Sequence, residues 1–290
     1  MTKENKHENS APNHICEQID RDNFMQVWII HQDPSPACTA FQHVPLAEAD
    51  GAREIVFELL AETIFIHHND LEEFRKNLER LVALGYPEAA EAVDQRPCDP
   101  LVRKGNFGEI VASEYLCQCE RYRIPVYRLR KSIKDSPMPG EDILAFKFGE
   151  DDSSEREILV GEAKVRSRYS KEVVEEAYQQ LCKSGQRPCP KSLLFIVNRL
   201  REQDRDDEAD RVLSLLNKFA PYQPTRRYMI FLITGNKPRD PFRCIQERDE
   251  VIDNLIAANI YIQDLDDFVN ALFDYKVESD GTRAGKADPR

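Results

Sequence analysis

The chain lacks several features that define common classes of protein. No run of apolar residues is long enough to span a membrane, and the opening stretch, MTKENKHENSAPNH, is too polar for a secretory signal. No G-x-x-x-x-G-K-[ST] phosphate-binding loop occurs. We therefore expect a cytoplasmic protein that makes no membrane contact and has no P-loop ATPase site of its own.

Cysteine is also scarce. The chain has eight cysteines in 290 residues, unevenly spaced, which favours reduced thiols over a disulfide framework. Cys117 and Cys119 lie two positions apart on a predicted helix, so their side chains point in different directions. No histidine follows His68 to complete a zinc site. The pattern argues against structural zinc.

Positive charge is in the minority, with 40 Lys and Arg against 52 Asp and Glu. This balance argues against a protein that coats nucleic acid indiscriminately. Two segments reverse the local sign, RYRIPVYRLRKSIK (121–134) and KVRSRYSK (164–171). Basic residues interleaved with tyrosines suit phosphate contacts and base stacking, but a solvated strand face would have the same composition. Both interpretations stay open.

The composition and periodicity of the chain divide it into four parts. We predict a disordered tail over residues 1–20, a mostly helical region over 21–98, an α/β domain over 99–276 and a flexible tail over 277–290. In the helical region we expect a strand at 23–31 and helices at 52–66, 70–84 and 87–93.

Helix and strand patterns alternate within residues 99–276. They predict, in order, a helix at 108–119, strands at 125–132, 142–149 and 156–166, a helix at 171–183, helical structure within 191–219, a strand at 226–235, and a helix, short strand and helix within 250–273. This order is typical of an α/β sandwich in which helices flank a mixed sheet.

The segment ILVGEAKVRSR (158–168) is an apolar strand that ends in charges on one face. Glu162 and Lys164 share a side with Ile158 and Val160, because alternate residues of a strand face the same way. A buried carboxylate and ammonium are costly unless they pair, bind an ion or meet a substrate. A salt bridge at the strand end is the simplest structural explanation.

Asp142 gives this strand end a second interpretation. Only an acidic loop separates the strands at 142–149 and 156–166, which predicts an antiparallel hairpin. A turn near residues 152 and 153 places Asp142 opposite residue 163, give or take one, and so beside Glu162. Two converging carboxylates repel unless a cation lies between them, and Mg²⁺, or Mn²⁺ with the same ligands, is the ion we expect. Lys164 alongside could orient or deprotonate an attacking water.

A further acid is expected from the segment KGNFGEIVASEYL (104–116). Gly105 and Gly108 permit close backbone approach where the predicted helix begins, and Glu109 is its first strong acid. A carboxylate favoured by the helix N-terminal dipole is the structural alternative.

Three phrases in order, KGNFGEIVASEYL, GEDILAF and LVGEAKVRS, resemble the PD-(D/E)xK nuclease core and, more narrowly, the HamA-like nuclease subunits of the Hachiman antiphage system. The resemblance covers about residues 100–275. It implies that Asp142 and Glu162 are metal ligands with the Ala163 carbonyl as a third, that Lys164 is the catalytic lysine, and that Glu109 is a further ligand or positions water. The "PD" of the pattern is here "ED".

The resemblance also implies partners. It implies DNA as the substrate and a HamB-like superfamily 2 helicase as the protein that supplies ATP hydrolysis. We take Lys104, Arg166 and Arg168 as candidate DNA-binding residues. The helical first hundred residues are our candidate for docking the helicase, and within them we expect His67 and His68, which follow an apolar helix, to be exposed. These residues could instead extend the nuclease core.

The sequence therefore predicts a metal-dependent DNA endonuclease, the effector subunit of a bacterial antiphage complex. One alternative is a catalytically inactive module on a nuclease-like fold that tethers DNA or the helicase. Another is a restriction or junction-resolving enzyme on the same fold.

Overall fold

The computed structural model describes residues 19–34, 38–130, 134–135, 140–149, 156–183, 187–217 and 223–277. Almost all of the two predicted tails lies outside these residues, as does the acidic loop between the strands of the predicted hairpin.

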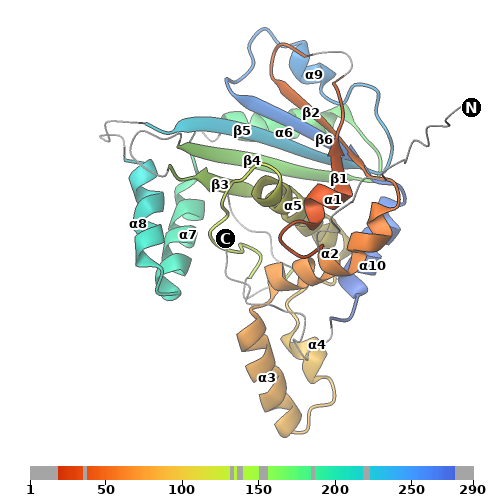
Figure 1. Cartoon of the computed structure of the whole chain (residues 1–290), viewed down its shortest axis with the longest axis vertical. Coiled ribbons are helices and arrows are strands. Elements are labelled where there is room, and N and C mark those ends of the chain that lie inside the picture. Colours follow the sequence, from red (N-terminus) through yellow and green to blue (C-terminus); the bar gives the residue numbers. More distant parts are fainter. Residues whose placement is uncertain are drawn as a thin grey trace, which may run out of the picture.

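A mixed six-stranded sheet forms the centre of the molecule (Figure 1), with strand order β1-β2-β6-β5-β4-β3. Its strands are β1 (Ile29–His31), β2 (Gln42–Glu48), β3 (Ile143–Lys147), β4 (Glu157–Arg166), β5 (Thr225–Thr234) and β6 (Leu255–Tyr261). The four inner strands run parallel, whereas β1 and β3 pair antiparallel with β2 and β4. The prediction of a mixed sheet flanked by helices is confirmed.

Helices cover both faces of the sheet (Figure 1). One face packs against α1 (Phe24–Trp28), α2 (Ala52–His68), α5 (Pro100–Gln118) and α10 (Leu265–Asp274), and the other against α6 (Lys171–Lys183), α7 (Pro190–Glu202), α8 (Asp206–Leu215) and α9 (Arg243–Gln246). The helices α3 (Leu71–Ala83) and α4 (Ala89–Val93) project from this body, and α3 buries no residue. None of the helices in the described ranges combines the length and the apolar character that crossing a bilayer requires.

Strand β4 divides the core into two hydrophobic clusters. Leu159, Ala163 and Val165 face the cluster that contains α5, and Ile158 and Val160 face the cluster that contains α6. This is the alternation that the sequence predicts. It puts Glu162 and Lys164, which continue the row of Ile158 and Val160, on the α6 side of the sheet.

The N-terminal region is continuous with the rest of the fold. Strand β2 pairs in parallel with β6, which lies more than 200 residues later in the chain, and residues of α1 and α2 share a core cluster with α5. Residues 29–31 and 42–48 therefore belong to the same sheet as the strands of the α/β domain. Strand β2 was not predicted, because Pro45 in its centre reads as a strand breaker.

Three predicted elements differ from the structure. Residues 24–28 are helical rather than extended, because Phe24, Met25 and Trp28 bury one helical face, and only residues 29–31 form strand. The predicted strand at 125–132 is wrong over its described part, residues 125–130, which are not strand. Arg123, just before it, makes an isolated bridge to Phe146. The segment 251–254 is a turn, not a helix.

Candidate active site

The end of the β3–β4 hairpin brings three predicted site residues together. The register pairs Ile143 with Gly161, so the next position places Asp142 opposite Glu162, one residue from the expected partner. The Lys164 Nζ donates to Glu162 Oε2 at 2.9 Å and lies 3.5 Å from Asp142 Oδ2. A single ammonium therefore contacts two carboxylates.

The backbone of Ala163 faces the same point. Its N–H donates to Asp142 Oδ2 at 3.0 Å. Because the N–H and C=O of one strand residue point to the same side of the strand, the Ala163 carbonyl also faces the start of β3. The Asp142 side chain is thereby fixed between a backbone donor and the lysine.

Burial perturbs the charges of this cluster. Glu162 is 4% exposed, and this burial, with the nearby Asp142 charge, raises the pKa of Glu162 to about 7 against the opposing effect of Lys164. Burial also disfavours the charged form of Lys164, but Asp142 and Glu162 outweigh it and raise the lysine pKa. The lysine is held protonated, while one carboxylate of the pair is poised to bind a proton or a cation.

Glu109 lies on helix α5, and it lines the same pocket as Asp142. The helix begins at Pro100, with Asp99 as its N-cap, accepting from the N–H groups of Leu101 and Val102. Glu109 therefore lies well inside the helix, and the N-terminal dipole explanation for its position does not hold.

Gly108 sets how closely α5 approaches β4. A Cβ at this position would lie 2.6 Å from Val165 Cγ2 and 3.5 Å from the Ala163 Cβ, whereas a Cβ at Gly105 would meet nothing within 4 Å. The predicted close approach is therefore confirmed for Gly108 but not for Gly105.

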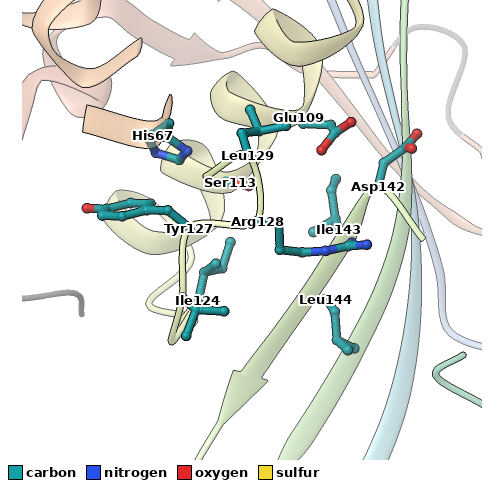
Figure 2. A pocket seen from close by; sticks show the side chains of 11 residues that line it. His67, Glu109, Ser113, Ile124, Tyr127, Arg128, Leu129, Asp142, Ile143 and Leu144 are labelled. Carbon is teal, nitrogen blue, oxygen red and sulfur yellow. The ribbon is translucent and has the colours of Figure 1, made fainter. Parts of the chain in front are cut away.

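A pocket lies between α5, the segment 124–129 and the start of β3, and Glu109 and Asp142 both line it. Figure 2 shows the Glu109 carboxylate pointing from α5 toward the start of β3, where Asp142 stands. The rest of the lining is largely apolar, with His67, Ser113, Tyr127 and Arg128 as the other polar side chains. Glu109 thus shares a largely apolar recess with Asp142, whereas Glu162 and Lys164 do not line it.

The residues present suit a hard divalent ion at the hairpin end. No group of three or more His, Cys, Asp and Glu side chains in the described ranges is arranged to hold a metal, so the converging ligands are the carboxylates of Asp142 and Glu162. Mg²⁺ is commonly bound by one or two carboxylates together with waters and substrate phosphates. A two-carboxylate site beside a carbonyl is consistent with that preference.

A buried network that the sequence analysis missed fixes the approach to Asp142. Gly140 has a φ of 98°, a conformation that disfavours side chains, and a Cβ there would collide with Ser192 Oγ. Arg128 Nη1 donates to the Glu141 carbonyl, and the Cys189 N–H donates to the Glu141 carboxylate. The only available signal was the Gly140-Glu141 pair before Asp142, because the partners come from distant segments.

The candidate DNA-binding residues divide into two groups. Lys104 is already compensated, since its Nζ lies 2.8 Å from Asp266 Oδ1 and donates to Ser167 Oγ at 3.0 Å. Arg166 and Arg168 are exposed on the segment that follows Lys164. Lys104 is therefore compensated within the protein, whereas both arginines are accessible from solvent and Arg166 Nη1 donates to the Val165 carbonyl.

Much of the basic segment 121–134 is structural in its described part. Arg128 is buried against Glu141, and Arg130 donates to the Ile66 carbonyl and pairs with Asp70 at 2.9 Å. Arg128 also donates to Ser192 of α7, so these two arginines hold the segment against α7 and α2. They fit neither the phosphate-binding interpretation nor that of a solvated strand face.

The expectation that His67 and His68 are exposed is wrong, whereas docking of a partner by the rest of the helical N-terminal region stays a prediction. Both are buried, at 5% and 1% exposure. His67 Nε2 lies 2.8 Å from Glu114 Oε1, and His68 contacts the Ile64 carbonyl through Nδ1 and Asn106 through Nε2. Their neighbours come from α5, so only tertiary packing reveals their burial.

Comparison of the sequence with known proteins identifies its family. The family model described as HamA matches residues 22–275, which include the N-terminal helices as well as the hairpin. The chain is also 28% identical over 253 residues to the Hachiman protein HamA of Bacillus cereus, covering 86% of this chain and 89% of that protein. With a match across both regions, the chain belongs to the HamA family.

Proposed function

We propose that the chain is a metal-dependent DNA endonuclease and the effector subunit of a bacterial antiphage complex. The observation that carries the proposal is the contact of one lysine with two carboxylates at the end of a β-hairpin. The family match and the similarity to a Hachiman protein support the biological setting.

In this proposal Asp142 and Glu162 hold a divalent ion, with the Ala163 carbonyl as a further oxygen ligand. Bound Mg²⁺, or Mn²⁺, would polarise a phosphoryl oxygen and lower the pKa of a bound water. Cation binding favours the deprotonated form of Glu162, whose pKa burial raises to about 7. The carboxylate pair then has a counter-charge that Lys164 alone does not fully supply.

Lys164 is the proposed catalytic lysine. Its ammonium donates to Glu162 and lies beside Asp142, and it is only partly buried, so it can also reach a phosphate oxygen that arrives from solvent. There it would orient the attacking water and offset the charge that develops on the phosphoryl group. The raised lysine pKa favours this electrostatic role over proton abstraction.

Glu109 is proposed to position water rather than to bind the ion directly. It lines a pocket with Asp142 but belongs to no group of three metal-binding side chains in the part of the chain that the structure describes. A carboxylate at that position can accept a hydrogen bond from a water on the ion.

The partner in this proposal is a HamB-like superfamily 2 helicase. The chain contains no P-loop motif, so ATP hydrolysis in the complex would have to come from another protein. Because His67 and His68 are buried, the helicase cannot dock on their side chains. The helices α3 and α4 project from the body of the molecule and are exposed parts of the same N-terminal region.

Plasmid integrity over time tests the proposal. Wild-type chain and the Glu162→Ala variant would each be incubated with supercoiled plasmid in Mg²⁺ or EDTA, alone and with the co-purified helicase. The Glu79→Ala variant, which removes an exposed carboxylate from α3, is the matched control. We expect nicking or degradation that needs Mg²⁺, persists in Glu79→Ala and disappears in Glu162→Ala.

The opposite result favours the tethering module. Binding of DNA by a well-folded wild-type chain, without cutting in any condition, would remove the enzyme proposal and leave a nuclease-like fold that holds DNA or the helicase.

A further inference from the structure

Two loops meet at the sheet end where the candidate active site lies. Strands β4 and β5 are parallel and pair up to Arg166 and Thr234, so the loops that follow them leave the sheet at the same end of the strands. Strand β3 is antiparallel to β4 and begins there. The residues after β4 and after β5 therefore emerge beside Asp142, Glu162 and Lys164.

The two loops are tied together. The Gly235 N–H donates to the Arg166 carbonyl at 3.0 Å, and a Cβ on Gly235 would lie 2.7 Å from the Ser167 carbonyl oxygen. The Tyr169 N–H donates to Asn236 Oδ1 at 2.6 Å, and its hydroxyl donates to the Pro241 carbonyl at 2.9 Å. These contacts give the pair of loops a single fixed arrangement.

The first loop is also anchored to the helices below the sheet. Ser167 Oγ donates to Asp266 on α10, and the same carboxylate pairs with Lys104 of α5. Side chains that flank Ser167 thus project from a held backbone, which lowers the ordering cost of binding through them.

Four basic side chains project from this scaffold, and we call them the two-loop basic surface. Arg166 is the last residue of β4, Arg168 lies in the loop that follows it, and Lys237 and Arg239 lie in the loop after β5. All four are exposed. Across the described ranges none of the four is paired with a carboxylate, whereas Lys104, Arg103 and Arg130 each are. The net charge of −12 averages over the whole chain, so a group of unpaired cations can still attract phosphate at this place, although Asp240, Glu172 and Glu175 lie near Tyr169.

We propose that the two-loop basic surface binds the phosphate backbone of DNA next to the scissile phosphate, with Lys237 and Arg239 contributing alongside Arg166 and Arg168. Arg166 shares a strand face with Lys164 and lies about 7 Å farther along, at a rise of about 3.3 Å per residue. The surface therefore begins where the lysine ends. This inference rests on the proposed nuclease function and assigns the substrate contact of that same site.

Equilibrium binding of a labelled DNA duplex, measured in EDTA at several salt concentrations, tests the inference without cleavage. Each phosphate contact removed lowers the magnitude of the slope of log K against log[salt] by roughly one. We expect Lys237→Ala with Arg239→Ala to lower the slope by about two, and Arg166→Ala with Arg168→Ala to do the same. The variant with all four substitutions should lower the magnitude of this slope by about four.

A control separates local contacts from net charge. Arg75→Ala with Arg80→Ala removes two exposed charges from α3, which projects from the body of the molecule, and should leave the slope unchanged. An unchanged slope in the Lys237 and Arg239 variant, or an equal loss in the α3 variant, would overturn the inference, with folding checked by circular dichroism. Binding without Mg²⁺-dependent cutting would instead overturn only the proposed chemistry.

Discussion

Two clusters of buried ionisable and polar side chains lie on opposite sides of this sheet, and they differ in how their charges balance. Under α2 and α5, Glu114 accepts from His67 and from Gln118, and Gln118 in turn accepts from the Met25 N–H. At the hairpin end, Asp142 and Glu162 share Lys164. In the first cluster, both oxygens of the Glu114 carboxylate accept hydrogen bonds from neighbouring side chains. The second cluster has two carboxylates and one ammonium, so one negative charge is left without a partner cation.

The pKa shifts follow the same division. His68, the neighbour of His67 on α2, contacts Asn106 of α5 and belongs with the first cluster. Burial lowers its pKa to about 3, so this ring stays neutral, with Nδ1 donating to the Ile64 carbonyl. Burial raises the pKa of Glu162 to about 7. A satisfied polar cluster stabilises the fold, whereas an acid in excess at the sheet end is available for a cation and a substrate.

The largest expected effect comes from removing the lysine at the second cluster. Lys164→Ala should lower cleavage by about 10³-fold or more, because the charge that stabilises the transition state is lost. The protein should still fold and bind its partner, because Glu162, whose pKa is already raised to about 7, can take up a proton when the ammonium is removed. Plasmid cleavage and urea unfolding measure the two effects, and retained cleavage would move the active site elsewhere.

The reverse pattern is expected at the first cluster. Glu114→Ala should lower the free energy of unfolding by about 3–5 kcal/mol, because it leaves buried His67 and Gln118 without their acceptor. Cleavage per folded molecule should stay within about threefold of wild type. A large loss of cleavage at unchanged stability would erase the distinction between the clusters.

Stability should depend on pH with opposite signs at the two clusters. A folded Glu162 binds its proton more tightly than the unfolded chain, so its contribution falls as pH rises from about 4.5 to about 7. Neutral His68 does the reverse: below about 6.5 the unfolded ring takes up protons, so stability falls as pH falls.

The Glu162→Gln variant isolates the pH dependence that Glu162 gives to the free energy of unfolding. In EDTA it should gain stability over wild type between pH 5 and pH 8, by up to about 3 kcal/mol at about 1.4 kcal/mol per pKa unit. The His68 contribution cancels in the difference. Urea unfolding of both proteins across this range provides the measurement, and a constant difference would show that burial does not perturb Glu162.

The smallest effects compare two glycines on α5. Gly108→Ala should cost about 1–3 kcal/mol, because its methyl group would press on Val165, and it should lower cleavage by displacing Glu109. Gly105→Ala meets open space and should stabilise the helix by about 0.5–1 kcal/mol. Equal effects at both positions would mean that the packing of α5 on β4 does not set the site.

Local rules were sufficient to predict the central part of the site. Strand alternation and a short hairpin connection place Asp142 beside Glu162 and Lys164, and the register differs from the expected one by a single residue. The start of α5 could also have been predicted from Asp99 and Pro100, which form an N-cap and first-turn pair.

Features that depend on distant segments could not be predicted from sequence. The support of Glu141 by Arg128 and Cys189 joins three separate parts of the chain. The burial of His67 and His68 depends on contacts with α5. Strand β2 contains Pro45, so its local sequence does not indicate a strand, and it is the pairing with β6 that stabilises the extended conformation. Tertiary partners decide each case.

Divalent-ion binding tests the central claim most directly, namely that the hairpin end carries an acid in excess for a cation. Mn²⁺ binding by electron paramagnetic resonance would be compared between wild type, Asp142→Asn, Glu162→Gln and the Glu79→Ala control, with DNA duplex present. We predict a saturable site in wild type and Glu79→Ala that weakens at least tenfold in each of the other two variants. Equal binding by all four proteins would contradict the account.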